Sequence, residues 1–168
     1  MALAFACGDS KTKQNEKKDL ETKASAQLEG MKKIDLGEYQ LSATISIPDD
    51  SKGKTEVVAT DWGSIEIKVS DWFGIEVVPF GMSIIDKKTE LKADLVYSIE
   101  YLTDEESLLF YKRTISGSEV DPEYHFFMTK EIDGDLVEVK SSGNQSFTKR
   151  QVEKMILSAK TLSPKAEV

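Results

Sequence analysis

The chain of 168 residues has only one cysteine, one histidine and four prolines. A single cysteine excludes an intramolecular disulfide and a thiolate cluster for zinc. A single histidine, His125, leaves one imidazole for any Ser-His-Asp or Cys-His scheme, and no nucleophile elbow accompanies it. The sequence also lacks an apolar run near the roughly 20 residues that a membrane-spanning helix requires.

Basic residues are scarce in most of the chain, and the formal net charge is -8. Residues 7–33 carry seven Lys against five Asp or Glu, whereas the part from Ile34 onward carries fifteen basic and twenty-five acidic residues, a net of -10. A domain of that sign repels phosphate groups, so neither nucleic acid nor direct adsorption on anionic lipid is expected. Basic or neutral partners remain open.

The amino terminus, MALAFAC, is small and apolar and ends at the only cysteine, and a polar, Lys-rich stretch follows. It resembles the Bacteroidota-type lipobox of bacterial lipoproteins: Ala6 and Cys7 match, and Ala4 stands where Leu is usual. The resemblance implies that Cys7 is lipidated, that residues 1–6 are a truncated signal-peptide remnant, and that the protein is an outer membrane lipoprotein on the periplasmic or surface face. The alternatives are an unmodified cysteine and a cytosolic binding module.

The domain organisation follows from a change in pattern. Residues 7–33 have no strand periodicity and few large apolar groups, which predicts a tether, with a thin helical stripe from Asp19 to Lys33. Residues 34–168 are expected to form a single domain. Its first strand is the alternating segment 39–47, ended by Pro48, and its second is Thr55 to Thr60.

The stretch DWGSIEIKVSDWFGIEV, residues 61–77, predicts an antiparallel hairpin. Its apolar residues share one face only if Val69 lies opposite Phe73 and Ile65 opposite Val77, since a slip of one residue would bury Glu76. This register puts Glu66 opposite Glu76, which favours an intervening lysine such as Lys68 or a bound cation. Trp72 is then at the tip of the hairpin, and Trp62 lies opposite Phe80 at the far end.

The remaining segments complete an α+β domain. We expect a short helix at 83–95, hairpins of 95–102 with 108–115 and of 123–132 with 136–141, and a type I′ turn at Asp133-Gly134. Thr148 and Gln151 form a capping box for a terminal helix, whose apolar stripe is Val152, Met155, Ile156 and Ala159. The prediction is an antiparallel β-sheet of about seven strands with a central short helix and a C-terminal helix packed on it.

This order of elements resembles the PsbP-like fold, shared by photosystem extrinsic proteins and a Ran-binding nuclear transport factor. The matching residues are Ile47-Pro48 at the end of an early strand and Phe147 to Leu162 in the closing helix. Members of that fold are mostly non-catalytic binding proteins, so the resemblance implies a binding role.

No catalytic, metal or cofactor site emerges from the residues. SKGKT lacks the first glycine of a phosphate loop, the DGD at 133–135 lacks the further ligands of a calcium loop, and His125 reads as an edge or surface residue. We therefore expect a non-enzymatic, membrane-anchored envelope lipoprotein that binds a protein partner or small ligand without a cofactor. The alternative is an envelope hydrolase or glycan-binding accessory protein that uses Trp72 and nearby carboxylates such as Glu66 and Glu76.

Overall fold

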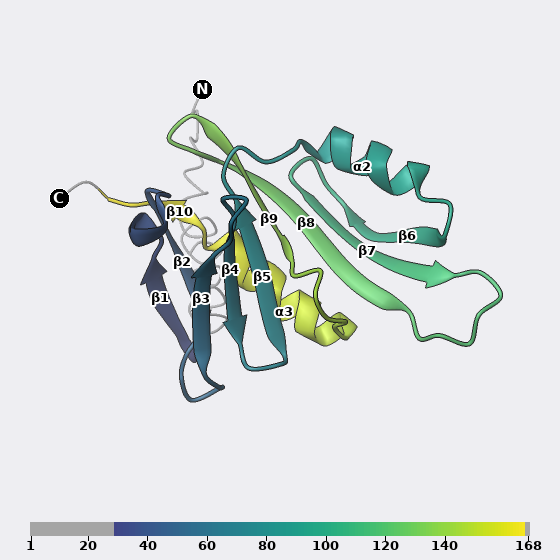
Figure 1. Ribbon diagram of the computed structural model, residues 1–168, viewed down its shortest axis with the longest axis horizontal. Coiled ribbons are helices and arrows are strands. Elements are labelled where there is room, and N and C mark those ends of the chain that lie inside the picture. The colour runs from purple at the N-terminus through teal and green to yellow at the C-terminus, as the bar shows by residue number, and fades with distance from the viewer. Residues whose placement is uncertain (1–28, 167–168) are drawn as a thin grey trace, which may run out of the picture. The chain divides into compact units, whose positions relative to one another are not determined.

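The computed structural model describes residues 29–166 (Figure 1). The chain divides into the units Met1–Gly30 and Met31–Val168, and all elements described below belong to the second. Neither helix in this part of the chain is long and apolar enough to cross a membrane. Its elements, in chain order, are β1 (Met31–Asp35), a 3-10 helix (Gly37–Tyr39), β2 (Ala43–Pro48), β3 (Thr55–Ala59), β4 (Ile65–Val69), β5 (Phe73–Val78), α2 (Ile84–Ala93), β6 (Tyr97–Asp104), β7 (Leu108–Ile115), β8 (Glu123–Ile132), β9 (Asp135–Ser141), α3 (Lys149–Lys160) and β10 (Ser163–Pro164).

Seven strands form an antiparallel sheet in the order β3-β4-β5-β9-β8-β7-β6. The predicted register of the β4–β5 hairpin is confirmed: Val69 pairs with Phe73, Ile67 with Ile75 and Ile65 with Val77. The predicted turn between β8 and β9 is also confirmed, because Asp133 and Gly134 both have positive φ, 53° and 89°. The alternation of apolar and polar residues therefore determined the pairing of neighbouring strands.

One face of this sheet carries the main core. The apolar residues of β5, β8 and β9 pack there against α3, which lies behind the long sheet in Figure 1, and those of β4 belong to the same core. The helix begins at the expected capping box, in which Thr148 and Gln151 exchange hydrogen bonds, and its stripe of Val152, Met155, Ile156 and Ala159 is buried. The closing helix was thus predicted correctly.

The opposite face is covered only in part. Helix α2, capped by Ser83, packs Ile84 and Leu91 on β7 and β8 against Leu109, Tyr111 and Phe127. Beyond α2, this face carries the polar residues of β4, β5 and β9. We call it the open face, and it holds the polar part of the candidate site.

A second, three-stranded sheet of order β1-β2-β10 was not predicted. The α+β class is confirmed, but the seven-stranded sheet is not the only one. Residues 31–33, expected at the end of the tether, form the first part of β1, and segment 39–42, expected in a strand, lies outside β2. Strand β1 is half exposed and carries two lysines, so it shows no apolar alternation. Residues 7–28 of the expected tether, with Cys7, and residues 1–6 lie outside the described residues.

Candidate functional site

Trp62 is presented on the turn between β3 and β4. The backbone N–H of Gly63 donates to the carbonyl of Thr60 at 3.0 Å, and Gly63 has φ 87°, a conformation that favours glycine. The indole ring is 77% exposed. Its Nε1–H donates to Oε1 of Glu76 at 3.3 Å, so one edge of the ring is held on the sheet.

Phe80 is presented on the loop between β5 and α2. Its side chain is also 77% exposed, and its backbone is left-handed, with φ 57°. A left-handed conformation costs a residue with a side chain about 1–2 kcal/mol, and it is rarest for bulky residues. Neither burial of the ring nor the backbone preference of phenylalanine explains this residue at this position.

The two rings line one pocket of about 410 Å³ at the end of the sheet. The 3-10 helix contributes Tyr39 to its wall, and the next residue, Gln40, also lines it and is left-handed, with φ 65°. The described residues that line it are Glu38, Tyr39, Gln40, Ala59, Thr60, Trp62, Gly63, Ser64, Pro79 and Phe80. Of the four residues other than glycine with positive φ in the described part of the chain, two belong to this aromatic pocket and two to hairpin turns.

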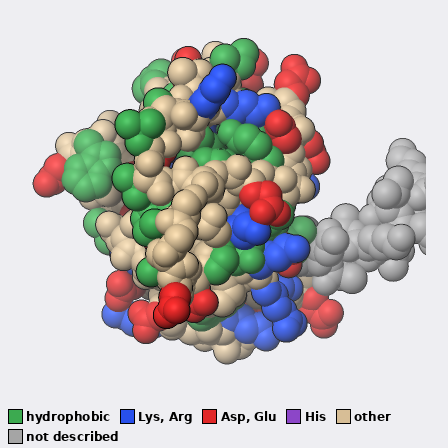
Figure 2. Space-filling model, turned by 90° about the vertical axis from the view of Figure 1, so that its right-hand side faces the viewer, with side chains coloured by type: hydrophobic (Ala, Val, Ile, Leu, Met, Phe, Trp, Pro, Cys, Tyr) green, Lys and Arg blue, Asp and Glu red, His purple; other side chains and the backbone are tan. Residues whose placement is uncertain are grey.

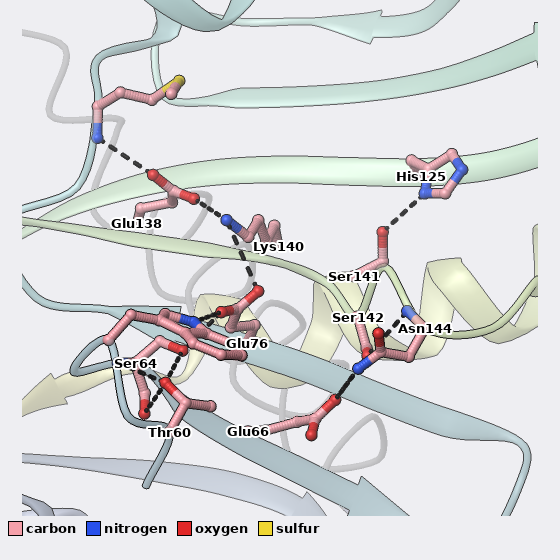
Figure 3. A network of polar contacts seen from close by, with 12 residues as sticks. Thr60, Ser64, Glu66, Glu76, His125, Glu138, Lys140, Ser141, Ser142 and Asn144 are labelled. Carbon is pink, nitrogen blue, oxygen red and sulfur yellow. Dashed lines mark hydrogen bonds and ion pairs between the residues drawn. The ribbon is translucent and has the colours of Figure 1, made fainter.

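A chain of polar contacts on the open face joins the two aromatic loops (Figure 3). Glu138 accepts the backbone N–H of Met82 at 3.1 Å, and its other oxygen binds Lys140 Nζ at 2.6 Å. Lys140 also lies 3.6 Å from Glu76, which accepts the Ser64 hydroxyl at 2.5 Å besides the indole of Trp62. The loop that carries Phe80 is therefore tied to the turn that carries Trp62.

The geometry of this chain depends on close packing at Gly81. The backbone N–H of Gly81 donates to the carbonyl of Leu136 at 3.0 Å, and a side chain at position 81 would collide with Cβ of Glu138. Glu138 is only 3% exposed, so its charge must be compensated. Burial opposes the charge of Lys140, but the hydrogen bond to Glu138 and the nearby carboxylates outweigh it and raise the pKa of Lys140.

Glu66 and Glu76 face each other across β4 and β5, as predicted, and each carboxylate has its own partners. Glu66 lies 3.1 Å from Lys68 Nζ and accepts the Ser142 hydroxyl at 2.8 Å and the amide of Asn144 at 3.2 Å. Burial acts to raise the pKa of Glu66, but these hydrogen bonds outweigh it and lower the pKa. Within residues 29–166, no group of three or more His, Cys, Asp or Glu side chains is placed to hold a metal ion.

His125 was read as an edge or surface residue, and that reading is wrong. It lies on β8, an inner strand, is 8% exposed, and stacks on Tyr111 with ring centroids 5.7 Å apart. Burial, with the charge of Arg113, lowers the pKa of His125, so the ring is neutral near pH 7. Tyr111 and Ser141, which contact the ring, were not visible as its neighbours from the sequence because they lie on β7 and β9.

The contacts of His125 resemble a Ser-His-Glu arrangement. Its Nδ1 lies 3.2 Å from the Ser141 hydroxyl, and its Nε2 lies 3.5 Å from Glu123. The same Glu123 oxygen binds Arg113 Nε at 2.5 Å, and the Ser141 hydroxyl also accepts the backbone N–H of Phe126 at 3.4 Å. Ser141 is thus already engaged as an acceptor, and Glu123 is primarily the partner of Arg113.

A smaller hollow of about 210 Å³ adjoins this histidine. Its charged lining consists of Lys87, Arg113, Lys140 and Glu76. Each of the three cations has a carboxylate partner: Glu90 for Lys87, Glu123 for Arg113 and Glu138 for Lys140. Among the described residues that line the hollow, no cation is therefore left free for an anionic ligand.

Trp72, which the alternative function pairs with the carboxylates, lies outside the aromatic pocket. It is half-buried, packs edge-on to Phe73 with centroids 5.7 Å apart, and donates its indole N–H to the Lys52 carbonyl at 3.0 Å. Trp62 is the tryptophan that the structure brings to Glu76.

Comparison with known proteins adds no relative: no protein-family model, no curated protein and no solved structure matches this chain.

Proposed function

We propose that the protein is a lipoprotein of the bacterial cell envelope, anchored through Cys7, whose domain is a non-catalytic binding module. Its ligand occupies the aromatic pocket of Trp62 and Phe80. The observation that carries the proposal is Phe80, an exposed aromatic ring on a strained backbone. Strain of this kind concentrates where a chain contacts a ligand, and an exposed aromatic pocket with a few polar groups has the composition of a binding site.

The polar chain supports binding rather than chemistry. Every buried side-chain nitrogen and oxygen in the described residues has a hydrogen-bond partner. Such a network fixes the positions of the rings before a ligand arrives, which lowers the entropic cost of binding. Reaction of the whole protein with a fluorophosphonate probe tests this point. We expect no labelling of Ser141, and labelling that Ser141→Ala abolishes would establish a serine hydrolase instead.

The architecture is proposed at a finer level as PsbP-like. Strand β2 ends at Ile47-Pro48, and the segment from Phe147 to Leu162 contains α3. These generic features support the resemblance, which stays a prediction.

The anchor is tested by labelling the native host with a clickable palmitate analogue. We expect wild-type protein to incorporate the label and Cys7→Ala to lose it. A native mature protein that retains residues 1–6 and an unmodified Cys7 sulfur would refute the anchor.

The pocket is tested by hydroxyl-radical footprinting of the protein in native envelopes and after purification. Trp62 and Phe80 should be protected in the envelope and reactive in the purified protein. Trp72 is the internal control, because its partial burial within the domain is the same in both samples. Equal reactivity of Trp62 and Phe80 in the two samples would show that nothing occupies the pocket in its native setting.

A further inference from the structure

From the lining of the aromatic pocket, we infer that it binds an organic cation, an alkylammonium group carried by a small molecule or by a lysine side chain. This inference rests on the proposed function, since it names the class of ligand. Three features carry it: the aromatic rings, the absence of a cation among the described lining residues, and the carboxylates beside the rings.

The rings supply the attraction. Trp62, Phe80 and Tyr39 approach the pocket from three separate segments of the chain. The face of an aromatic ring has a negative electrostatic potential and attracts cations within about 6 Å of its centre, most strongly for tryptophan. An ammonium group among several rings replaces part of its hydration by these contacts.

The charges around the pocket favour a ligand of positive charge. No Lys or Arg of residues 29–166 lines the pocket, whereas Glu38 lines it and Glu76 lies 3.3 Å from the indole nitrogen of Trp62. Residues 29–166 carry 17 basic and 25 acidic residues, a net of -8, which attracts cations over a longer range. On the face drawn in Figure 2, Lys and Arg side chains gather at the lower right. An anionic ligand would therefore be repelled.

The strained backbone places the rings. Gln40 and Phe80, both left-handed, stand in two of the segments that form the walls. Glu138 holds the Phe80 loop through the N–H of Met82, and Glu76 holds Trp62. The pocket is thus prepared for a ligand rather than formed by it, which suits a weakly held, compact group such as ammonium.

The test compares choline with 3,3-dimethylbutanol, a neutral molecule of the same shape. Trp72→Phe leaves Trp62 as the only indole, since the chain has two tryptophans, so its fluorescence reports binding in the full-length protein. We expect choline to bind roughly 5- to 30-fold more tightly than its neutral analogue, and added salt to weaken it. A second comparison, of the amide of Nα-acetyl-lysine with that of Nα-acetyl-norleucine, tests whether the pocket binds an ammonium group carried by a lysine side chain.

Two variants assign the effect to the pocket. Trp62→Leu keeps an apolar side chain and removes the ring, so the preference for choline should disappear when binding is followed by NMR. Glu38→Gln should weaken choline and leave dimethylbutanol unchanged. Equal affinity for choline and dimethylbutanol, or no binding of choline or of the lysine amide, would overturn the inference. Protection of Trp62 and Phe80 in native envelopes would then still support the proposed binding function, with a different class of ligand.

Discussion

Lys140 is the residue whose loss should damage the site most. The variant Lys140→Met keeps an apolar stem of similar length and removes the ammonium group that joins Glu138 to Glu76. Glu138 would remain 3% exposed with only the Met82 N–H as its partner. The variant therefore tests whether the polar chain supports the fold as well as the pocket.

The magnitude follows from the burial of the pair. Removing one partner of a buried ion pair costs about 3–5 kcal/mol. Because the Lys140 side chain is 33% exposed, we expect the lower end of that range, about 3 kcal/mol in the free energy of unfolding. For a domain of this size, the melting temperature should fall by roughly 6–12 °C.

The cost is measured as a difference in the free energy of unfolding. Equilibrium unfolding of wild type and of Lys140→Met in urea at neutral pH, followed by circular dichroism, gives this difference.

Two controls make the result decisive. Lys54→Met removes an ion pair whose members are 81% and 55% exposed, and it should leave the melting temperature unchanged. The double variant Lys140→Met/Glu138→Leu removes both charges and should recover most of the lost stability. If Lys140→Met were as stable as Lys54→Met at neutral pH, the polar chain would not hold the site as described.

Three further predictions concern single residues. Because the pKa of His125 is lowered in the folded protein, the unfolded chain takes up a proton at this residue below about pH 6.5 before the folded protein does. Wild type should therefore lose more stability than His125→Asn as the pH falls through that region. Urea unfolding titrations at several pH values measure this difference. Gly81→Ala should destabilise the domain by roughly 1–3 kcal/mol in the same assay, because the added methyl group collides with β9, and a neutral result would mean that the loop can shift freely. Phe80→Gly should change the free energy of unfolding by less than about 1 kcal/mol, because relief of the left-handed backbone offsets the little burial that is lost. Phe73→Ala, in the core, should cost about 3–5 kcal/mol. Similar losses for the two variants in calorimetry would contradict the strain at Phe80.

The parts of the fold that the sequence predicted are those with strong local rules. The register of β4 and β5 follows from the requirement that Ile67 and Ile75 share a buried face. The start of α3 follows from the spacing of Thr148 and Gln151. Strand β1 escaped prediction because its sequence is polar and its partner β2 supplies most of the burial.

The candidate site was only half predictable. The hairpin register put Trp62 opposite Phe80, and both residues do line one pocket. The strain at Phe80 was invisible, because a left-handed backbone at phenylalanine has no sequence signature. The role of Lys140 was also hidden, since β9 lies beside β5 only after a connection that includes α2 and three other strands. Long-range pairing of this kind cannot be read from a single sequence.

The small sheet has a consequence for the order of folding. Strand β2 lies between β1, at the start of the domain, and β10, near its end, where Ser163 pairs with Thr44. During synthesis the β1–β2 hairpin emerges before α3 and β10, the later segments that pack on β2 or pair with it. Contacts between such distant segments form slowly. The nascent polypeptide therefore cannot complete its core until the chain as far as Pro164 has left the ribosome.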